Sequence, residues 1–215
     1  MTERSDPRAP KQPRAAWTRE RLLDALSELL AEQPLEDIRL TDVAARAGMT
    51  VGAIYGRFDG KTDMVVAAYE RYTDDAVKRM ESWAEDPRWA EATPREVVAS
   101  WVEGMFAFTG RREPVVRLGA GTTEPRIAEA EWRVVSCSAE KLTQLLAPVV
   151  PEQGDTLARN VGFAVIACRS MMVHRGSIPT TGPLGFDDAQ FVEAIIDLML
   201  GMAGLPADTR SERHP

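Results

Sequence analysis

Residues 50–64 carry the sequence TVGAIYGRFDGKTDM, in which Gly52 and Gly56 interrupt what otherwise has the pattern of a short amphipathic helix. A glycine in a helix interior destabilises the helix by about 0.5–1 kcal/mol relative to alanine. Ile54 and Phe58 lie four residues apart, so they share the face that is turned toward the core. Both glycines fall on the outer side, where missing side chains let another molecule approach the helix backbone.

The preceding segment, RLTDVAARAG at residues 39–48, predicts a second short helix whose apolar stripe includes Val43 and Ala47. Gly48 follows the last turn, at the position where a left-handed residue commonly ends a helix. Two short helices joined by a tight turn form a helix-turn-helix, whose second helix lies in the major groove of DNA. The alternative is a surface helix with two incidental glycines, because the pattern alone is degenerate.

A further helix is expected upstream of this pair. Thr18 is predicted to cap its N-terminus, with Trp17 and Leu22 at the spacing of a hydrophobic staple, and Pro34 ends its periodicity. The three helices together predict a DNA-binding domain over residues 17–62.

Residues 18–70 resemble the DNA-binding domain of the TetR (tetracycline repressor) family, most clearly in VAARAGMTVGAIYGRF and in the turn before Lys61. The resemblance implies an all-α protein, with an N-terminal three-helix domain and a C-terminal helical domain for ligand binding and dimerisation. It also implies contacts with double-stranded operator DNA from both short helices and the following turn. The candidate DNA-binding residues are Thr41, Arg46, Thr50, Val51, Gly52, Tyr55, Gly56, Arg57 and Lys61.

The chemistry of three of these residues supports that role. The Tyr55 hydroxyl can donate to a phosphate, and Arg57 can reach a phosphate or a guanine edge. Lys61 stands at the start of the next helix, where backbone N–H groups already favour an anion.

The sequence departs from the family pattern at three positions. Val51 stands where the family often has lysine, and Gly56 stands where an aromatic ring is common. Arg39 takes the place of a serine or threonine cap, so we expect the second helix to start as late as Thr41.

The net charge of −7 is unevenly distributed along the chain. Residues 1–62 carry ten Lys/Arg and ten Asp/Glu, whereas residues 63–215 carry 16 Lys/Arg and 23 Asp/Glu. The N-terminal part can therefore face DNA if its basic residues gather on one side. Residues 1–16 are polar and rich in proline, and we expect a disordered basic arm that is either a solvated tail or a DNA contact.

Residues 63–205 have helical periodicity and no useful alternating pattern, which predicts an all-α C-terminal domain. Thr93, Pro94 and Glu96 combine a capping box with a proline at the first helical position, so a helix should begin there. The segment EPVVRLGAG is interpreted as a short apolar turn, and residues 206–215 as a flexible tail. Further long helices are expected over about residues 62–83, 124–146, 155–175 and 188–203.

Aromatic and sulfur-containing side chains form stripes on several of these helices. Such stripes are usually core, but they also line apolar ligand pockets in which a few polar groups set the orientation. We therefore expect a small-molecule effector to bind among them. The candidate ligand-binding residues are Trp101, Met105, Phe108, Thr109, Trp132, Arg133, Ser136 and Phe163.

The last two helices are apolar on most sides, so another surface must bury them. That surface belongs either to a second copy of the chain or to the same subunit. The family resemblance implies a homodimer with a four-helix interface, and Ile195 is the position at which we expect a charge to break it.

No residues are arranged for catalysis, and no cofactor is expected. His174 and His214 are the two histidines, and no His/Cys cluster has metal-ligand spacing. Cys137 and Cys168 are interpreted as core thiols rather than as a redox pair. There is no run of about 18 apolar residues and no apolar stretch of a secretory signal, so a cytoplasmic protein without a membrane span is expected.

These observations predict a ligand-responsive DNA-binding transcriptional regulator, a repressor that a small apolar or amphipathic molecule releases from a palindromic operator. Two alternatives stay open. One is an all-α small-molecule enzyme, which would need an acid/base pair that the sequence does not offer. The other is a DNA-binding regulator that a protein partner controls without a small ligand.

Overall fold

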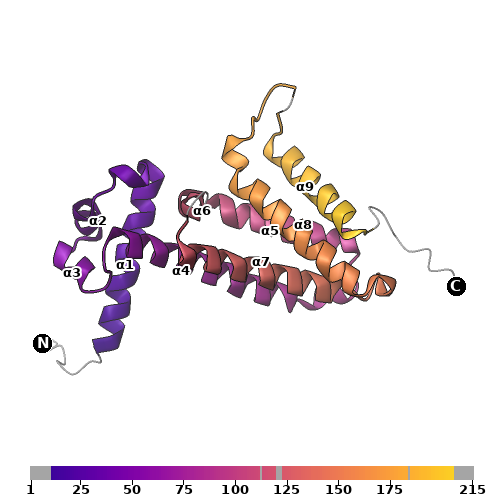
Figure 1. The fold of residues 1–215 in the computed structure, drawn as a ribbon, viewed down its shortest axis with the longest axis horizontal. Coiled ribbons are helices and arrows are strands. Elements are labelled where there is room, and N and C mark those ends of the chain that lie inside the picture. The colour runs from indigo at the N-terminus through magenta and orange to yellow at the C-terminus, as the bar shows by residue number, and fades with distance from the viewer. Residues whose placement is uncertain (1–10, 112, 120–122, 184, 206–215) are drawn as a thin grey trace, which may run out of the picture. The chain divides into compact units, whose positions relative to one another are not determined.

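The computed structural model describes residues 11–111, 113–119, 123–183 and 185–205, and every regular element in these ranges is a helix (Figure 1). The expected all-α fold, with an N-terminal helix-turn-helix domain and a C-terminal helical domain, is confirmed. Contacts divide the chain into an N-terminal unit, Met1–Ala68, and a C-terminal unit, Tyr69–Pro215. Residues 1–10 and the predicted tail at 206–215 lie outside the described ranges. None of the described helices is long and apolar enough to cross a membrane.

From residue 11 onward, the N-terminal unit contains three helices and the start of a fourth, packed around apolar side chains such as Leu22, Leu26 and Ile54, all almost fully buried. Its elements are α1 (Lys11–Glu32), the short 3-10 turn η1 (Leu35–Asp37), α2 (Leu40–Ala47), α3 (Val51–Tyr55) and the first residues of α4 (Lys61–Ala84).

Helix α1 begins earlier than the sequence pattern predicts. Thr18 lies inside the helix and is not its N-cap, and residues 11–16, expected to belong to a disordered arm, are helical. Pro13 does not prevent this, because the first four N–H groups of a helix need no intrahelical partner. Trp17 is not a staple residue either, since it is 57% exposed and its ring lies 4.9 Å from the guanidinium carbon of Arg21.

In the parts that the structure describes, the C-terminal unit continues from the later turns of α4 through five more helices and short 3-10 turns. Its elements are η2 (Pro87–Ala90), α5 (Pro94–Arg111), α6 (Glu113–Gly119), α7 (Pro125–Leu146), η3 (Pro151–Gln153), α8 (Asp155–Val173), η4 (Arg175–Ser177) and α9 (Asp188–Ala203).

The start of α5 is as predicted. The Thr93 N–H donates to Glu96 Oε2 at 2.8 Å, and the Glu96 N–H donates to Thr93 Oγ1 at 3.3 Å. The segment expected to be a turn after α5 is instead the short helix α6, in which Val115 and Val116 are buried.

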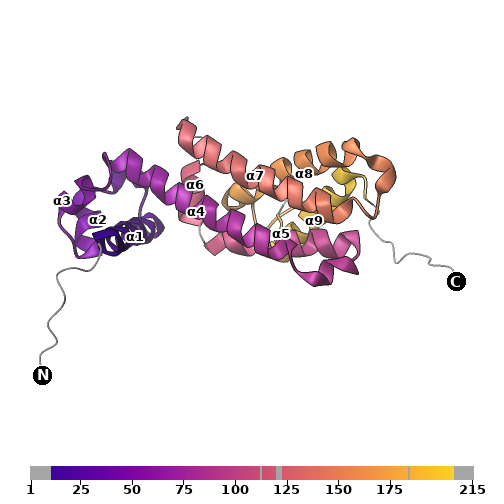
Figure 2. The same cartoon turned by 90° about the horizontal axis from the view of Figure 1, so that it is seen from below.

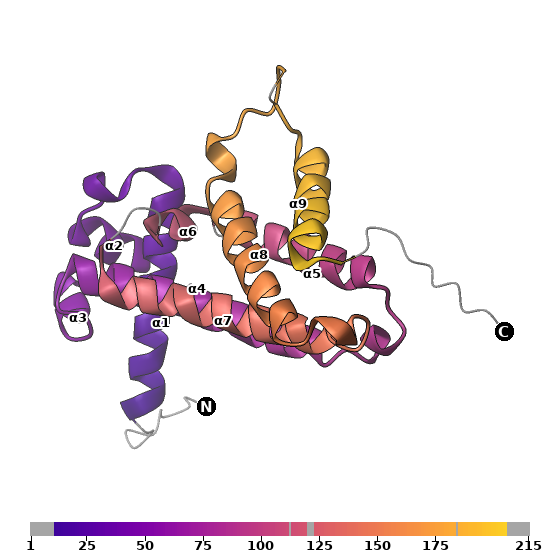
Figure 3. The same cartoon turned by 45° about the vertical axis from the view of Figure 1, so that its right-hand side comes forward.

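Helix α7 lies alongside the second half of α4, as Figure 2 shows, and ion pairs join Glu70 to Arg126 and Asp74 to Arg133. Helices α8 and α9 lie side by side, and α9 also packs on α5 (Figure 3). The core between these helices is apolar and includes Trp101, which is almost completely buried.

A polar network connects α4, α7 and α8 within the C-terminal unit. The Tyr69 hydroxyl donates to Glu131 Oε2 at 2.6 Å, and Arg169 Nη2 donates to the same oxygen at 2.8 Å. Arg169 Nη2 also donates to the Tyr72 hydroxyl at 3.3 Å. The guanidinium of Arg169 is 3% exposed, so each of its donors must find a partner inside the protein. No sequence pattern predicted this network.

Gly119, the last residue of α6, packs against this network. A Cβ atom at this position would clash with the Tyr69 hydroxyl and lie 2.7 Å from two atoms of its ring. The absence of a side chain therefore lets α6 end directly against the tyrosine that binds Glu131.

Candidate nucleic-acid interface and ligand pocket

The turn between α2 and α3 is fixed by backbone hydrogen bonds. Gly48 adopts φ 66° and ψ 37°, the left-handed conformation predicted for it, and its N–H donates to Ala45 O at 3.0 Å. The Met49 N–H donates to Ala44 O at 2.8 Å, which satisfies another carbonyl of the last turn. Helix α2 begins at Leu40 rather than at Thr41, because Asp42 Oδ2 accepts from the Arg39 N–H at 2.9 Å.

Helix α3 buries Ile54 and turns its other side to solvent. Tyr55 is 62% exposed, and Gly52 and Gly56 are exposed beside it. Thr41 and Thr50 are exposed as well, whereas Val51 and Arg57 are half-buried. The helix is shorter than expected, since it ends at Tyr55 and Gly56 is its C-cap instead of an interior residue.

The protein itself does not require either glycine of α3. A Cβ atom at Gly52 would lie 3.7 Å from Thr50 Oγ1, and one at Gly56 would lie 3.5 Å from Gly52 O, both ordinary contacts. Neither residue has a positive φ, so no backbone conformation demands glycine. No contact or backbone conformation among the described residues therefore accounts for glycine at these two positions.

Two of the candidate DNA contacts are engaged within the N-terminal unit. Arg46 donates to Glu32 Oε2 at 2.7 Å and to Glu28 Oε2 at 3.3 Å, which ties α2 to α1. The hydrogen bond with Glu32 raises the pKa of Arg46 further above its usual value.

The side chain of Lys61 is also engaged within the N-terminal unit. Its Nζ donates to the carbonyl oxygens of Leu35 and Glu36, and so holds η1 in place. At the start of α4, the carboxylate of Asp63 accepts from the Asp59 N–H at 3.2 Å. The first turn of α4 thus already contains an acidic side chain of the protein, which the helix dipole favours.

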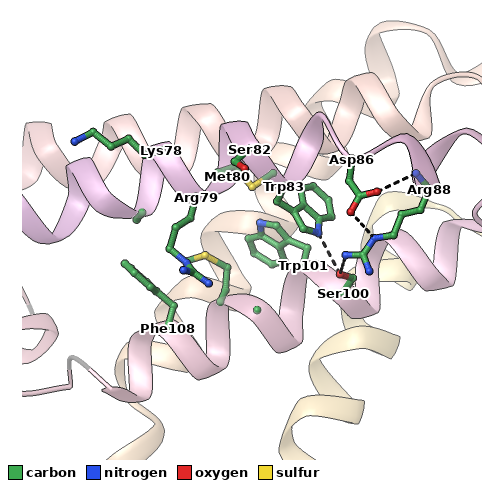
Figure 4. Close-up of a pocket in the computed structure, with 13 residues that line it drawn as sticks. Lys78, Arg79, Met80, Ser82, Trp83, Asp86, Arg88, Ser100, Trp101 and Phe108 are labelled. Atoms are coloured by element: carbon green, nitrogen blue, oxygen red, sulfur yellow. Dashed lines mark hydrogen bonds and ion pairs between the residues drawn. The ribbon is translucent and has the colours of Figure 1, made fainter.

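A pocket of about 450 Å³ opens between α4 and α5 in the C-terminal unit (Figure 4). Trp101, Met105 and Phe108, three of the predicted ligand-binding residues, line it. The facing helix contributes Met80 and Trp83, which the sequence analysis did not select. Polar and charged residues surround this apolar surface, namely Lys78, Arg79, Ser82, Asp86, Arg88 and Ser100.

The other predicted ligand-binding residues do not line this pocket. Trp132 and Phe163 are 60% and 63% exposed, and Ser136 is exposed too. Arg133 pairs with Asp74 at 3.1 Å. Thr109 is buried, and its hydroxyl has no hydrogen-bond partner among the described residues.

The exposed apolar residues of the last two long helices include Phe163, Ile166 and Leu198. Ile195 is 2% exposed within its own subunit, so the expectation that it marks a dimer surface is wrong. Ile195 and Leu198 are both apolar residues of α9, so residue type alone could not distinguish the buried position from the exposed one.

No group of three or more His, Cys, Asp or Glu side chains suited to a metal ion is found within the described ranges. Cys168 is buried, and burial raises the pKa of its thiol to about 12. Cys137 is half-buried, and burial raises the pKa of its thiol as well.

Comparison with known proteins gives sequence matches to the N-terminal unit and structural matches to most of the chain. Residues 22–68 match the model of the tetR family of bacterial regulatory proteins. The HTH-type transcriptional regulator SrpR of Pseudomonas putida is 40% identical over 53 residues, which span a quarter of this chain and a quarter of that protein.

Solved structures resemble almost the whole chain. A tetR-family regulator from Streptomyces coelicolor has a TM-score of 0.65 at 17% identity, covering 88% of this chain and 80% of that one. A TetR/AcrR-family regulator from Thermobifida fusca has a TM-score of 0.62 at 23% identity, covering 85% and 96%. At these identities the likeness establishes the shared fold.

Proposed function

We propose that this chain is a regulator of the tetR family, which its residues 22–68 match, and that it represses transcription by binding a palindromic operator as a homodimer until a small effector releases it. This is the role of a cytoplasmic DNA-binding protein, without catalysis. The observation that carries the proposal is the flat outer face of α3, with Tyr55 exposed between two glycines that the isolated chain does not need.

The two glycines of α3 support this role. A major groove about 12 Å wide admits a helix, and a helix without side chains on its outer face can approach the base edges most closely. Tyr55 stands beside that face, where its hydroxyl can donate to a phosphate. Arg46 and Lys61 act mainly within the protein under this proposal, holding α1, η1 and α2 around the recognition helix.

A second copy of the chain is the proposed partner of α8 and α9. Phe163, Ile166 and Leu198 are exposed large apolar side chains on these two helices. Covering them with the same helices of another subunit gives a symmetric interface, and two symmetric recognition helices require a palindromic operator.

The pocket between α4 and α5 is the proposed effector site. Helix α4 is continuous from Lys61 to Ala84, so its first residues belong to the N-terminal unit and its last turns line the pocket. An effector that favours one position of α4 would thereby change the spacing of the recognition helices. A coupling free energy of about 1–3 kcal/mol is typical of such regulation.

The DNA-binding part of the proposal is tested with fragments that the purified protein selects from a random DNA library. Gly52→Glu places a carboxylate on the outer face of α3, and the structure has room for it. We expect it to weaken binding to the selected DNA at least about a hundredfold, because a phosphate backbone repels the added charge. Ala31→Glu adds the same charge at an exposed position of α1 and serves as the control.

Fluorescence anisotropy of labelled DNA measures both affinities. Equal losses for the two variants would mean that net charge, not α3, determines binding. Selection of sequences without two-fold symmetry would contradict the proposed dimeric arrangement.

A further inference from the structure

We propose that the pocket between α4 and α5 takes an amphipathic anion, an apolar body with one carboxylate or comparable acid group, which Arg79 and Trp101 recognise. This inference rests on the proposed effector site and specifies its ligand. Three features of the pocket carry it, namely its apolar walls, the distribution of its charges and one unsatisfied donor.

The walls of the pocket suit an apolar body. Trp83 on α4 and Trp101 on α5 both point into the space between their helices (Figure 4). Met80, Met105 and Phe108 extend this surface. Flexible thioethers and flat rings adapt to hydrocarbon of varied shape, so the walls set the size of the ligand more than its detailed outline.

The charged groups of the pocket fall into two sets. Arg88 is already neutralised, because its Nε lies 3.2 Å from Asp86 Oδ2 and its Nη2 donates to Ser100 Oγ at 3.3 Å. Lys78 and Arg79, by contrast, have no carboxylate within ion-pair distance among the described residues. The pocket therefore presents an excess of positive charge, which an anion would complement.

Arg79 is the better placed of these two cations. Its guanidinium carbon lies 5.4 Å from the centre of the Phe108 ring, a cation–π contact that keeps the group at the apolar wall. A planar guanidinium can bind an acid group through two parallel hydrogen bonds, whereas an ammonium acts as a point charge. An acid group beside Arg79 would leave the rest of the ligand on the aromatic surface.

The unsatisfied donor belongs to Trp101. This side chain is 2% exposed, and its Nε1 has no hydrogen-bond partner among the described residues. The two neighbouring indoles are satisfied, since Trp83 Nε1 donates to Ser100 Oγ at 3.1 Å and Trp89 Nε1 donates to Trp83 O at 2.6 Å. A buried indole N–H normally finds an acceptor, and in this pocket an oxygen of the ligand would supply it.

The test compares two fluorescent dyes that differ by one charge. Anilinonaphthalene sulfonate has an apolar ring system with a sulfonate, and N-phenylnaphthylamine has the same rings without it. Titration of the full chain without DNA should give at least about tenfold tighter binding for the anion. Arg79→Gln should make the two affinities equal, and Arg79→Lys should restore part of the difference.

Two further variants locate the binding. Trp101→Phe keeps the apolar wall but removes the N–H, so it should weaken the anionic dye more than the neutral one. Arg133→Gln removes an arginine outside the pocket and should change neither affinity. Phe163→Ser likewise excludes binding of the dyes to the exposed apolar surface of α8. Circular dichroism confirms that each variant is folded.

Equal affinities of the wild type for both dyes would overturn the inference, as would an Arg79→Gln variant that keeps the preference for the anion. Loss of the preference for the anionic dye in the Arg133→Gln variant would overturn it too. Because the titration contains no DNA, its outcome is separate from effector release. A dye that binds as expected without changing DNA affinity supports the ligand class and contradicts the release mechanism.

Discussion

Two arginines of this protein make the same kind of ion pair in opposite surroundings. Arg46 joins α2 to α1 by contacts with Glu32 and Glu28 at the surface of the N-terminal unit. Arg169 joins α8 to α7 by contacts with Glu131 inside the C-terminal unit, where the two tyrosines of α4 complete the network. Water and salt screen the attraction within the exposed pair. Loss of either partner of the buried pair leaves the other as an uncompensated charge inside the protein.

The pKa of Glu131 reflects this balance. Burial disfavours its charged form, but the hydrogen bonds and positive charge of Arg169, with the hydroxyl of Tyr69, outweigh burial and lower the pKa below its ordinary value. Burial also opposes the charge of Arg169, yet the hydrogen bond with Glu131 leads to a raised pKa. The pair therefore stays charged in the folded protein, and its members depend on each other.

The largest effect should come from Arg169→Met. This change leaves the Glu131 carboxylate without its cation, and we expect the free energy of unfolding of the C-terminal unit to fall by about 3–5 kcal/mol. Urea titration followed by tryptophan fluorescence measures it, since Trp83, Trp89, Trp101 and Trp132 all lie in that unit. The double variant Arg169→Met, Glu131→Leu should recover most of the loss. A single variant as stable as the wild type would show that the buried pair is not needed.

Tyr69→Phe should have the next largest effect. It removes the 2.6 Å hydrogen bond to the Glu131 carboxylate while keeping the ring, so a loss of about 1.5–3 kcal/mol is expected in the same titration. Tyr72→Phe is the matched control, because its hydroxyl lies 3.3 Å from Arg169 Nη2 and the expected loss is about 0.5–1.5 kcal/mol. The reverse order of the two losses would contradict the assignment of Tyr69 as the principal donor.

Protonation should weaken the buried network in a defined direction. The pKa of Glu131 is lowered in the folded state from its ordinary value of 4.5. Its contribution to stability is therefore complete above about pH 4.5 and is lost as the pH falls through the folded-state pKa. Unfolding titrations at a series of acidic pH values should show a steeper decline for the wild type than for Glu131→Gln. Parallel declines would assign the acid sensitivity to other carboxylates.

The smallest effect on stability is expected for Arg46→Gln. The glutamates that lose their partner are exposed to water, so the unfolding midpoint of the N-terminal unit should barely move at physiological salt. DNA binding provides the sharper measurement. If Arg46 serves only the protein, the dependence of log Kd on log salt concentration keeps the wild-type slope, whereas a lost phosphate contact reduces that slope by about one.

The sequence predicted the N-terminal unit in more detail than the C-terminal one. Gly48, the apolar stripe of α2 that contains Val43, and the inward-facing Ile54 of α3 are local signals, and the structure contains each of them as expected. The predicted start of α1 at Thr18 was wrong, because a proline in the first turn does not oppose a helix and α1 begins at Lys11. The partners of Arg46 and Lys61 lie 14 and 26 residues away, so no local pattern could reveal them.

In the C-terminal unit, the periodicity of each helix predicted its apolar face but not which other helix that face contacts. Trp101, Met105 and Phe108 share one face of α5, and this spacing was sufficient to select the wall that α5 contributes to the pocket. The other half comes from Met80 and Trp83 at the end of α4, and their apposition depends on how two helices cross. Glu131 and Arg169 looked like ordinary charged positions, because burial of a charge is a property of the assembled helices.

The contact between Gly119 and Tyr69 also constrains how this chain can evolve. Even alanine at position 119 would overlap the ring of Tyr69, so a larger residue there becomes acceptable only after the tyrosine has been replaced by a smaller side chain. That first step would take from Glu131 one of its donors. Positions 69, 119 and 131 should therefore vary together among descendants of this sequence, and replacement of the tyrosine at position 69 should precede replacement of the glycine at position 119.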